Sequence, residues 1–150
     1  MKPVGLAILE EVFTHMHLNG VGYSLGAKAP SMTCDSSQIH KIDCSGFVRY
    51  AIARATEQAV VMPDGSVNQH DWCDSQKLPK LAYPNVGKPD ATGKLFIGFI
   101  QPAHGHPGHV WLVHNATTLE SHGGVGVDSR PWNSRVLVNA VAACYELPCE

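Results

Sequence analysis

The sequence predicts an α+β fold in which N-terminal helices pack on an antiparallel β-meander, and three observations predict it. In the first third of the chain, apolar residues recur at three- and four-residue spacing, which is typical of helices with one buried face. The last third instead contains continuous apolar runs of strand length, at residues 94–100 and 109–114. The helical segments precede the strands and do not alternate with them, which favours an α+β domain over a parallel α/β sheet.

Length and composition predict one globular domain that covers residues 1–150. A hydrophobic fraction of 44% with 16% charged residues argues against a disordered chain. The formal net charge is -2 and there is no run of Lys or Arg, so we expect no nucleic-acid partner. No apolar run approaches the roughly 18 residues of a membrane span. The first residues do not form a signal peptide, so we expect synthesis in the cytoplasm without one.

Three helices are expected from the apolar spacing and the residues at their ends. The first covers residues 3–18, because Pro3 suits a first turn and Asn19 and Gly20 suit the end of a helix. The second covers residues 44–56 and follows Asp43, whose carboxylate suits the N-cap. A shorter helix is expected at 66–76, and most of the remaining segment between residues 58 and 89 is expected to be loop.

Four strands are expected, and the sheet is expected to pack on the helix of residues 44–56. The strands are predicted at 94–100, 109–114, 117–122 and 136–147. Asn115 and Ala116 form a tight connection between the second and third strands, as a hairpin needs. A hairpin closed there places His109 opposite His122, about 5 Å apart at Cβ. A register slip of one residue places Ser121 opposite His109 instead.

Cys44 is the candidate nucleophile, because the free N–H groups and the dipole of a helix N-terminus favour a thiolate. A buried cysteine that only packs under a helix end explains this residue equally well when it is taken alone. A thiolate that attacks an amide needs an imidazole to hold its charge and later to protonate the leaving amine. The predicted hairpin brings two histidines together, so His109 can serve as the base and His122 as the group that orients it.

These residues resemble the NlpC-type cell-wall cysteine peptidases, a circularly permuted papain-like family. The resemblance rests on Asp-Cys-Ser-Gly-Phe at residues 43–47, on Gly-His-Val at residues 108–110, and on His122. It implies that Cys44, His109 and His122 form the catalytic set. Gly-Tyr-Ser-Leu-Gly at residues 22–26 is similar to a family segment in which a tyrosine helps to build the substrate pocket, which implies that role for Tyr23.

Two features depart from the family pattern. The segment between Tyr23 and Asp43 lacks the usual Trp-Gly-Gly sequence. The third catalytic position is displaced from its commonest spacing, so Ser121 or Glu120 is an alternative group for orienting His109.

The resemblance implies hydrolysis of an amide bond in a peptidoglycan stem peptide, typically between D-glutamate and the diamino acid, through a thioester. It implies no cofactor and no metal. Asp43 and Ser45 flank the nucleophile and are candidate contacts to the stem peptide, although an Asp in the position of Asp43 is more often only a helix cap. The segment that follows Glu120 also resembles phage-type and secreted-effector members of the family. This implies delivery to the periplasm or cell wall by phage or secretion machinery, with an immunity or delivery protein as a possible partner.

Two other functions stay open at this point. The first is a zinc-binding protein, because the chain has nine histidines and clusters His104, His106 and His109 on one Gly-Pro segment. Against it, that cluster has no neighbouring carboxylate, and His114 should face away from His109. We expect His104, His106 and His114 to be solvated loop or edge residues. The second is an inactive peptide-binding module on the same fold.

The redox state of the cysteines also stays open. Besides Cys44, four cysteines remain, which form either two disulfides or free thiols: Cys34, Cys73, Cys144 and Cys149.

Overall fold

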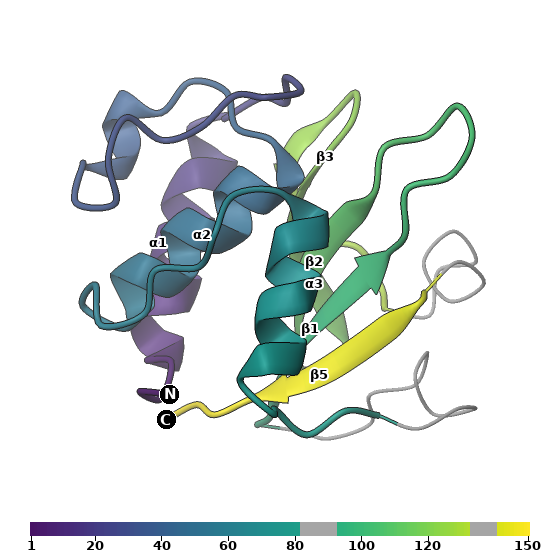
Figure 1. Cartoon of the computed structure of the whole chain (residues 1–150). Helices are drawn as coiled ribbons and strands as arrows, with labels where there is room; N and C mark the ends of the chain where they lie inside the picture. Colours follow the sequence, from purple (N-terminus) through teal and green to yellow (C-terminus); the bar gives the residue numbers. More distant parts are fainter. Residues whose placement is uncertain (82–92, 133–140) are drawn as a thin grey trace.

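The computed structural model describes residues 1–81, 93–132 and 141–150, and it has the predicted α+β architecture (Figure 1). The helices are α1 (Leu6–Leu18), α2 (Cys44–Ala55) and α3 (Ser66–Ser75), with a single 3-10 turn, η1 (Ser36–Gln38). The strands are β1 (Leu95–Ile100), β2 (His109–His114), β3 (Thr117–His122), β4 (Gly126–Asp128) and β5 (Ala143–Leu147). Within the described ranges, no helix has the length and apolar character needed to cross a membrane.

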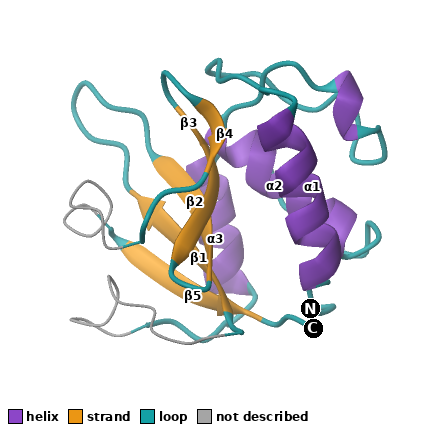
Figure 2. Cartoon of the chain, turned by 180° about the vertical axis from the view of Figure 1, so that it is seen from behind, coloured by secondary structure: helices purple, strands orange, loops and turns teal. Residues whose placement is uncertain are grey.

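The five strands form one antiparallel sheet in the order β4-β3-β2-β1-β5. The strands from β1 to β4 follow one another as a meander, and β5 returns to pair with the free edge of β1. Helices α1 and α2 stand beside one face of the sheet (Figure 2). Helix α3 lies on the same face over β1 and β5, where the ring of His70 stacks on Phe99 and meets Tyr145 edge to face.

The main core lies between the helices and the sheet. Apolar side chains of α2, such as Phe47, Val48 and Ile52, are fully buried there with Val110 and Leu112 of β2. The predicted packing of the sheet on the helix that carries Cys44 is therefore present. A second, smaller cluster covers the opposite face of the sheet around Trp111 and Trp132.

Helix α1 begins at Leu6, and the predicted start at Pro3 is wrong. Residues 3–5 are extended because the chain there pairs with its own C-terminus. Val4 donates its N–H to the carbonyl of Pro148 at 2.8 Å, and Glu150 returns a bond to the carbonyl of Val4 at 3.0 Å. This pairing holds the two ends of the chain side by side, as Figures 1 and 2 both show.

The hairpin of β2 and β3 has the predicted bounds, whereas the two last strands differ from the prediction. Strand β5 begins at Ala143, and residues 136–140 of the strand predicted at 136–147 lie outside the described residues. Strand β4 was not predicted from the sequence. The residues from 82 to 89, predicted to be loop, also lie outside the described residues. All five cysteines are free thiols in this structure.

Candidate active site

Cys44 is the first residue of α2, and Asp43 is its N-cap as predicted. The Asp43 carboxylate accepts a hydrogen bond from the N–H of Gly46 at 2.7 Å, which supplies a partner to one of the free donors of the first turn. A Cβ at Gly46 would lie 2.8 Å from Asp43 Oδ1 and 3.0 Å from the carbonyl oxygen of Ala27. Local geometry therefore explains the Asp-Cys-Ser-Gly sequence. Asp43 caps the helix, Cys44 is its first residue, and Gly46 leaves room for the Asp43 carboxylate because it has no Cβ.

Lys28 binds the two residues that flank the nucleophile. Its Nζ atom lies 2.7 Å from Asp43 Oδ1 and 2.9 Å from Ser45 Oγ, and 3.3 Å from a carboxylate oxygen of Asp64. Asp43 and Ser45 are only 4% and 3% exposed. The side chains that were predicted to touch the stem peptide are thus engaged inside the protein. No sequence pattern marks Lys28, which lies in an irregular loop and belongs to no motif.

Tyr23 reaches the nucleophile because its segment runs alongside the approach to α2. Gly22 accepts a hydrogen bond from the N–H of Ile42 and donates one to the carbonyl of His40, each at 2.9 Å. Burial, together with the nearby charges of Cys44 and Asp43, raises the pKa of Tyr23. Tyr23 is therefore a neutral phenol at neutral pH.

His109 stands at the start of β2, where it is hydrogen-bonded to Glu120 and lies close enough to Cys44 for the thiol to affect its pKa. Its Nε2 atom lies 2.8 Å from Glu120 Oε1, which leaves Nδ1 as the ring nitrogen for the sulfur. Burial lowers the pKa of His109, but the hydrogen bonds and charges of Cys44 and Glu120 outweigh that effect and raise it to about 9. The imidazole is thus held as an imidazolium when the thiol is ionised.

Glu120 is fully buried and ionised, and three side chains donate to it. Besides His109, these are Arg130, whose Nε lies 3.0 Å from Oε2, and the hydroxyl of Thr118. A second bond from Arg130 Nη2 to Oε1 makes the pair bidentate. Burial raises the pKa of Glu120, but these donors lower it to about 2. The sequence placed Glu120 only among the alternatives, and Arg130 was not assigned a role.

The ring of His122 is hydrogen-bonded to Asp128, whereas the ring of His109 is hydrogen-bonded to Glu120. The register of the hairpin is the predicted one, with Leu112 opposite Leu119 and Val113 opposite Thr118. Further along, β3 pairs with β4, and His122 lies opposite Gly126 with its ring Nε2 2.9 Å from Asp128 Oδ2.

Glu120 lies two residues before His122 and therefore on the same face of the strand. Its side chain is long enough to reach His109 diagonally across the two strands. The contact predicted for His122 is therefore made by Glu120.

Ser121, the other alternative, has a different position. It points to the helix side, and its hydroxyl donates to the carbonyl of Ile42 at 2.7 Å. This bond links β3 to the residue just before Asp43. It connects the strand that carries Glu120 with the N-terminus of the helix that carries Cys44.

The histidine cluster does not form a metal centre within the described residues, where no three His, Cys, Asp or Glu side chains are grouped for one ion. His104 and His106 are exposed, as predicted, on a tight turn closed by two backbone bonds between Ala103 and His106. His114 is not a solvated residue as predicted, because it is buried and its Nδ1 lies 3.1 Å from Glu10. It faces the helix side of the sheet, away from His109.

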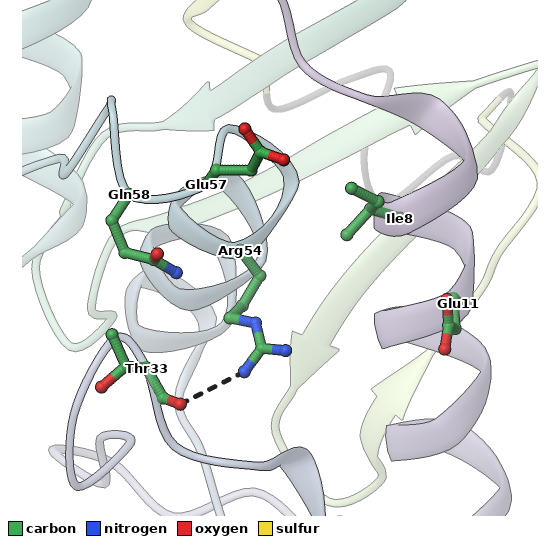
Figure 3. Close-up of a pocket in the computed structure, with 6 residues that line it drawn as sticks. All are labelled: Ile8, Glu11, Thr33, Arg54, Glu57 and Gln58. Carbon is green, nitrogen blue, oxygen red and sulfur yellow. Dashed lines mark hydrogen bonds between the residues drawn. The ribbon is translucent and has the colours of Figure 1, made fainter.

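Two cavities differ in their relation to these residues. One cavity of about 460 Å³ lies at the other end of α2 and is lined by residues that include Glu11, Arg54 and Glu57 (Figure 3). There Arg54 Nη1 donates to the carbonyl of Thr33 at 3.4 Å. This cavity is not lined by Cys44, His109 or Glu120. A second cavity of about 470 Å³ is lined by His109 itself.

Comparisons with known proteins agree with this arrangement at the level of the fold. No protein-family model matches the sequence, and no curated protein matches it. Among solved structures, the chain is similar to a protein from Staphylococcus aureus described as similar to lipoprotein, of the NLP/P60 family (TM-score 0.62, 13% identity). It is also similar to an NlpC/P60 family protein from Bacillus cereus (TM-score 0.60, 16% identity).

These matches cover nearly all of this chain but only part of the other proteins. They include 97% and 93% of this chain, against 42% and 40% of the respective neighbours. The chain therefore has the fold of NlpC/P60 proteins and spans about two-fifths of the length of these two structures.

Proposed function

We propose that this protein is a cysteine peptidase that hydrolyses an amide bond in the stem peptide of peptidoglycan. The observation that carries the proposal is one row of residues: Cys44 at the N-terminus of α2, His109 near it at the start of β2, and the ionised Glu120 hydrogen-bonded to His109. A nucleophile, a base and a group that orients the base are the parts that acyl transfer requires. The likeness to NlpC/P60 proteins supports the same class of reaction at the level of the fold.

In the proposed reaction, the Cys44 thiolate attacks the amide carbon and forms a carbon–sulfur bond. The carbonyl electrons move onto oxygen, and the backbone N–H of Cys44 stabilises this oxyanion together with the Tyr23 hydroxyl. When the tetrahedral intermediate collapses, the carbon–nitrogen bond breaks, and His109 gives its proton to the leaving amine. His109 then takes a proton from water, the hydroxide attacks the thioester, and the acid is released with the thiolate restored.

The flanking polar residues are assigned supporting roles. We infer that Glu120 holds the His109 ring in one orientation and stabilises its imidazolium form, which is the role first predicted for His122. Asp43 and Ser45 are inferred to fix the first turn of α2 through Lys28, because their polar atoms are engaged there. Tyr23 also belongs to the predicted substrate-binding set. We infer that its hydroxyl acts at the reacting centre, where it helps to stabilise the oxyanion.

The bond between D-glutamate and the diamino acid is the proposed target. Mass spectrometry of purified peptidoglycan, incubated with the intact protein and with Cys44→Ala, tests this directly. We expect new stem-peptide fragments from the intact protein, none from Cys44→Ala, and no effect of a chelator. Unchanged peptidoglycan of both Gram types would contradict the proposal, and cleavage that only a chelator abolishes would point to a metal enzyme.

If peptidoglycan is not cleaved, thiol reactivity distinguishes an inactive peptide-binding module from an active enzyme that cleaves a different substrate. In an enzyme of the proposed kind, Cys44 is expected to react with iodoacetamide faster than Cys73 does. A Cys44 that reacts no faster than Cys73 would indicate an inactive module.

A further inference from the structure

The cavity lined by His109 lies beside the proposed reacting centre and has a defined wall. Its apolar residues are Ile100, Ala103, Pro107 and Ala142. Gln101 and His106 are its other described residues, and among them none is Asp, Glu, Lys or Arg. A cavity of about 470 Å³ with mainly apolar walls and a few polar groups is typical of a small-ligand site.

Backbone hydrogen bonds hold segments whose residues line the cavity. Ala103 and His106 exchange two backbone bonds, at 2.9 and 3.2 Å, which close the turn between β1 and β2. On the other side, Ala142 donates to the carbonyl of Phe99 at 2.7 Å. Ile100 lies opposite His109 in the register of β1 and β2, so it supplies the floor between these two walls.

The position of the cavity determines which part of a substrate it can hold. In the proposed reaction His109 protonates the leaving nitrogen, so that nitrogen must lie next to the imidazole. Cys44, which carries the acyl carbon in the proposed intermediate, lies near the His109 ring. The same ring lines the cavity. Groups attached to the leaving nitrogen therefore extend toward the cavity.

We propose that this cavity binds the aliphatic side chain of the residue whose amine leaves. The inference rests on the proposed function, and it names the chemical class of the group: an unbranched chain of methylenes, such as the stem of a diamino acid. Apolar walls favour such a chain because burial of each methylene removes apolar surface from water.

A series of synthetic amides tests the proposal. The substrates are L-Ala-γ-D-Glu-X amides in which X is alanine, 2-aminobutyrate, norvaline or norleucine, and the release of X amide is measured. We expect kcat/KM to rise by about fourfold for each added methylene, which is the factor that about 0.8 kcal/mol per methylene gives.

Two variants and one matched control locate the effect. Ala103→Asp and Ala142→Asp place a charge in opposite walls of the cavity, and both should flatten the dependence on chain length. Ala7→Asp introduces the same charge on the exposed side of α1 and should retain it. A flat series in the intact protein, with cleavage that still depends on Cys44, would overturn the cavity proposal and leave the proposed function standing.

A binding measurement keeps the proposal testable without turnover. In Cys44→Ala, amide NMR signals are followed during titration with norleucinamide and, separately, with glycinamide. Shifts at Ala103 and Ala142 with norleucinamide but not with glycinamide would support the cavity proposal. They would do so even if no peptidoglycan is cleaved, and in that case only the proposed function would fail. Equal shifts with both amides, or none at these residues, would overturn it.

Discussion

At the scale of single residues, the charge of Glu120 is the feature on which the site depends. A carboxylate that is fully buried would normally take up a proton, since burial disfavours the charged form. Here Arg130 and Thr118 donate to it from behind, and His109 from the front. The pKa of Glu120 is lowered to about 2, so the carboxylate stays ionised at neutral pH and can stabilise an imidazolium throughout the catalytic cycle.

Glu120→Gln should lower kcat/KM by about 100-fold, because the amide keeps the shape of the side chain but removes the charge that His109 requires. The loss of this anion lowers the pKa of His109 from about 9, so the alkaline limb of the pH profile should move to lower pH. The measurement is the pH dependence of stem-peptide cleavage.

His122→Ala is the matched control for this experiment. His122 is bonded to Asp128 and not to His109, so its removal should leave the alkaline limb in place. The opposite pattern, with a normal Glu120→Gln enzyme and a shifted limb in His122→Ala, would restore the role that the sequence first suggested for His122.

The residues that the sequence predicted best are those that act through their immediate neighbours in the chain. Asp43, Cys44 and Gly46 form one helix start, and a cap motif requires no knowledge of the rest of the fold. Lys28 and Arg130 reach the site from segments far away in the sequence, so no local pattern marks them. The choice between Glu120 and His122 depended on side-chain reach across two strands, although the strand register itself was predicted.

At the scale of secondary-structure elements, the relation between α2 and the sheet decides whether Cys44 meets His109. Ser121 of β3 donates to the carbonyl of Ile42, and the Gln69 side chain of α3 donates to the carbonyl of Ser45 at 2.9 Å. Both bonds hold the N-terminal end of α2, from two different elements. The position of the nucleophile is therefore fixed by its neighbours as well as by its own helix.

Ser121→Ala should lower the free energy of unfolding by about 1–2 kcal/mol, because it leaves a buried carbonyl without this donor. Chemical denaturation of the intact protein and the variant measures this. Ser75→Ala is the control, since the Ser75 hydroxyl donates to Trp72 of its own helix at an exposed position and should contribute little. Equal destabilisation by the two substitutions would argue against a special role for the link between β3 and α2.

Helices and strands with a clear spacing or run of apolar residues were predictable from the sequence, and the short strand β4 was not. The sequence alternates glycine and valine around β4, which offers little of the apolar run that identifies a strand. What defines β4 is contact: Val127 donates to the carbonyl of Val21 at 3.0 Å. At Gly126, φ is +102° and a Cβ would lie 2.2 Å from that same carbonyl oxygen. Only glycine allows this close approach beside the segment that carries Tyr23.

At the scale of the whole molecule, three separate parts of the fold meet at the candidate site. Helix α2 supplies Cys44, the sheet supplies His109 and Glu120, and the segment after β4 supplies Arg130. The charged row therefore crosses parts of the chain that are distant in sequence, and it forms only when they are assembled. The ionisation of this row is consequently coupled to the stability of the folded protein.

The sign of that coupling follows from the two pKa values. The pKa of His109 is raised to about 9, so its contribution is complete below its unfolded value of 6.5 and is lost as the pH rises through 9. The pKa of Glu120 is lowered to about 2, so its contribution is complete above 4.5 and is lost as the pH falls through 2. The row therefore stabilises the fold most between pH 4.5 and 6.5.

The difference in the free energy of unfolding between the intact protein and His109→Gln should thus depend on pH. We expect it to be largest near pH 6 and to decrease by up to about 3 kcal/mol as the pH approaches 9, from about 1.4 kcal/mol for each unit of pKa shift. Urea denaturation at several pH values measures the difference. His104→Gln, which removes an exposed imidazole on the turn between β1 and β2, should give a difference that hardly changes over this range. If the curves of His109→Gln and the intact protein were parallel from pH 6 to pH 9, the imidazolium would not be stabilised by the fold, and Glu120 would not hold the charge that the proposed mechanism requires.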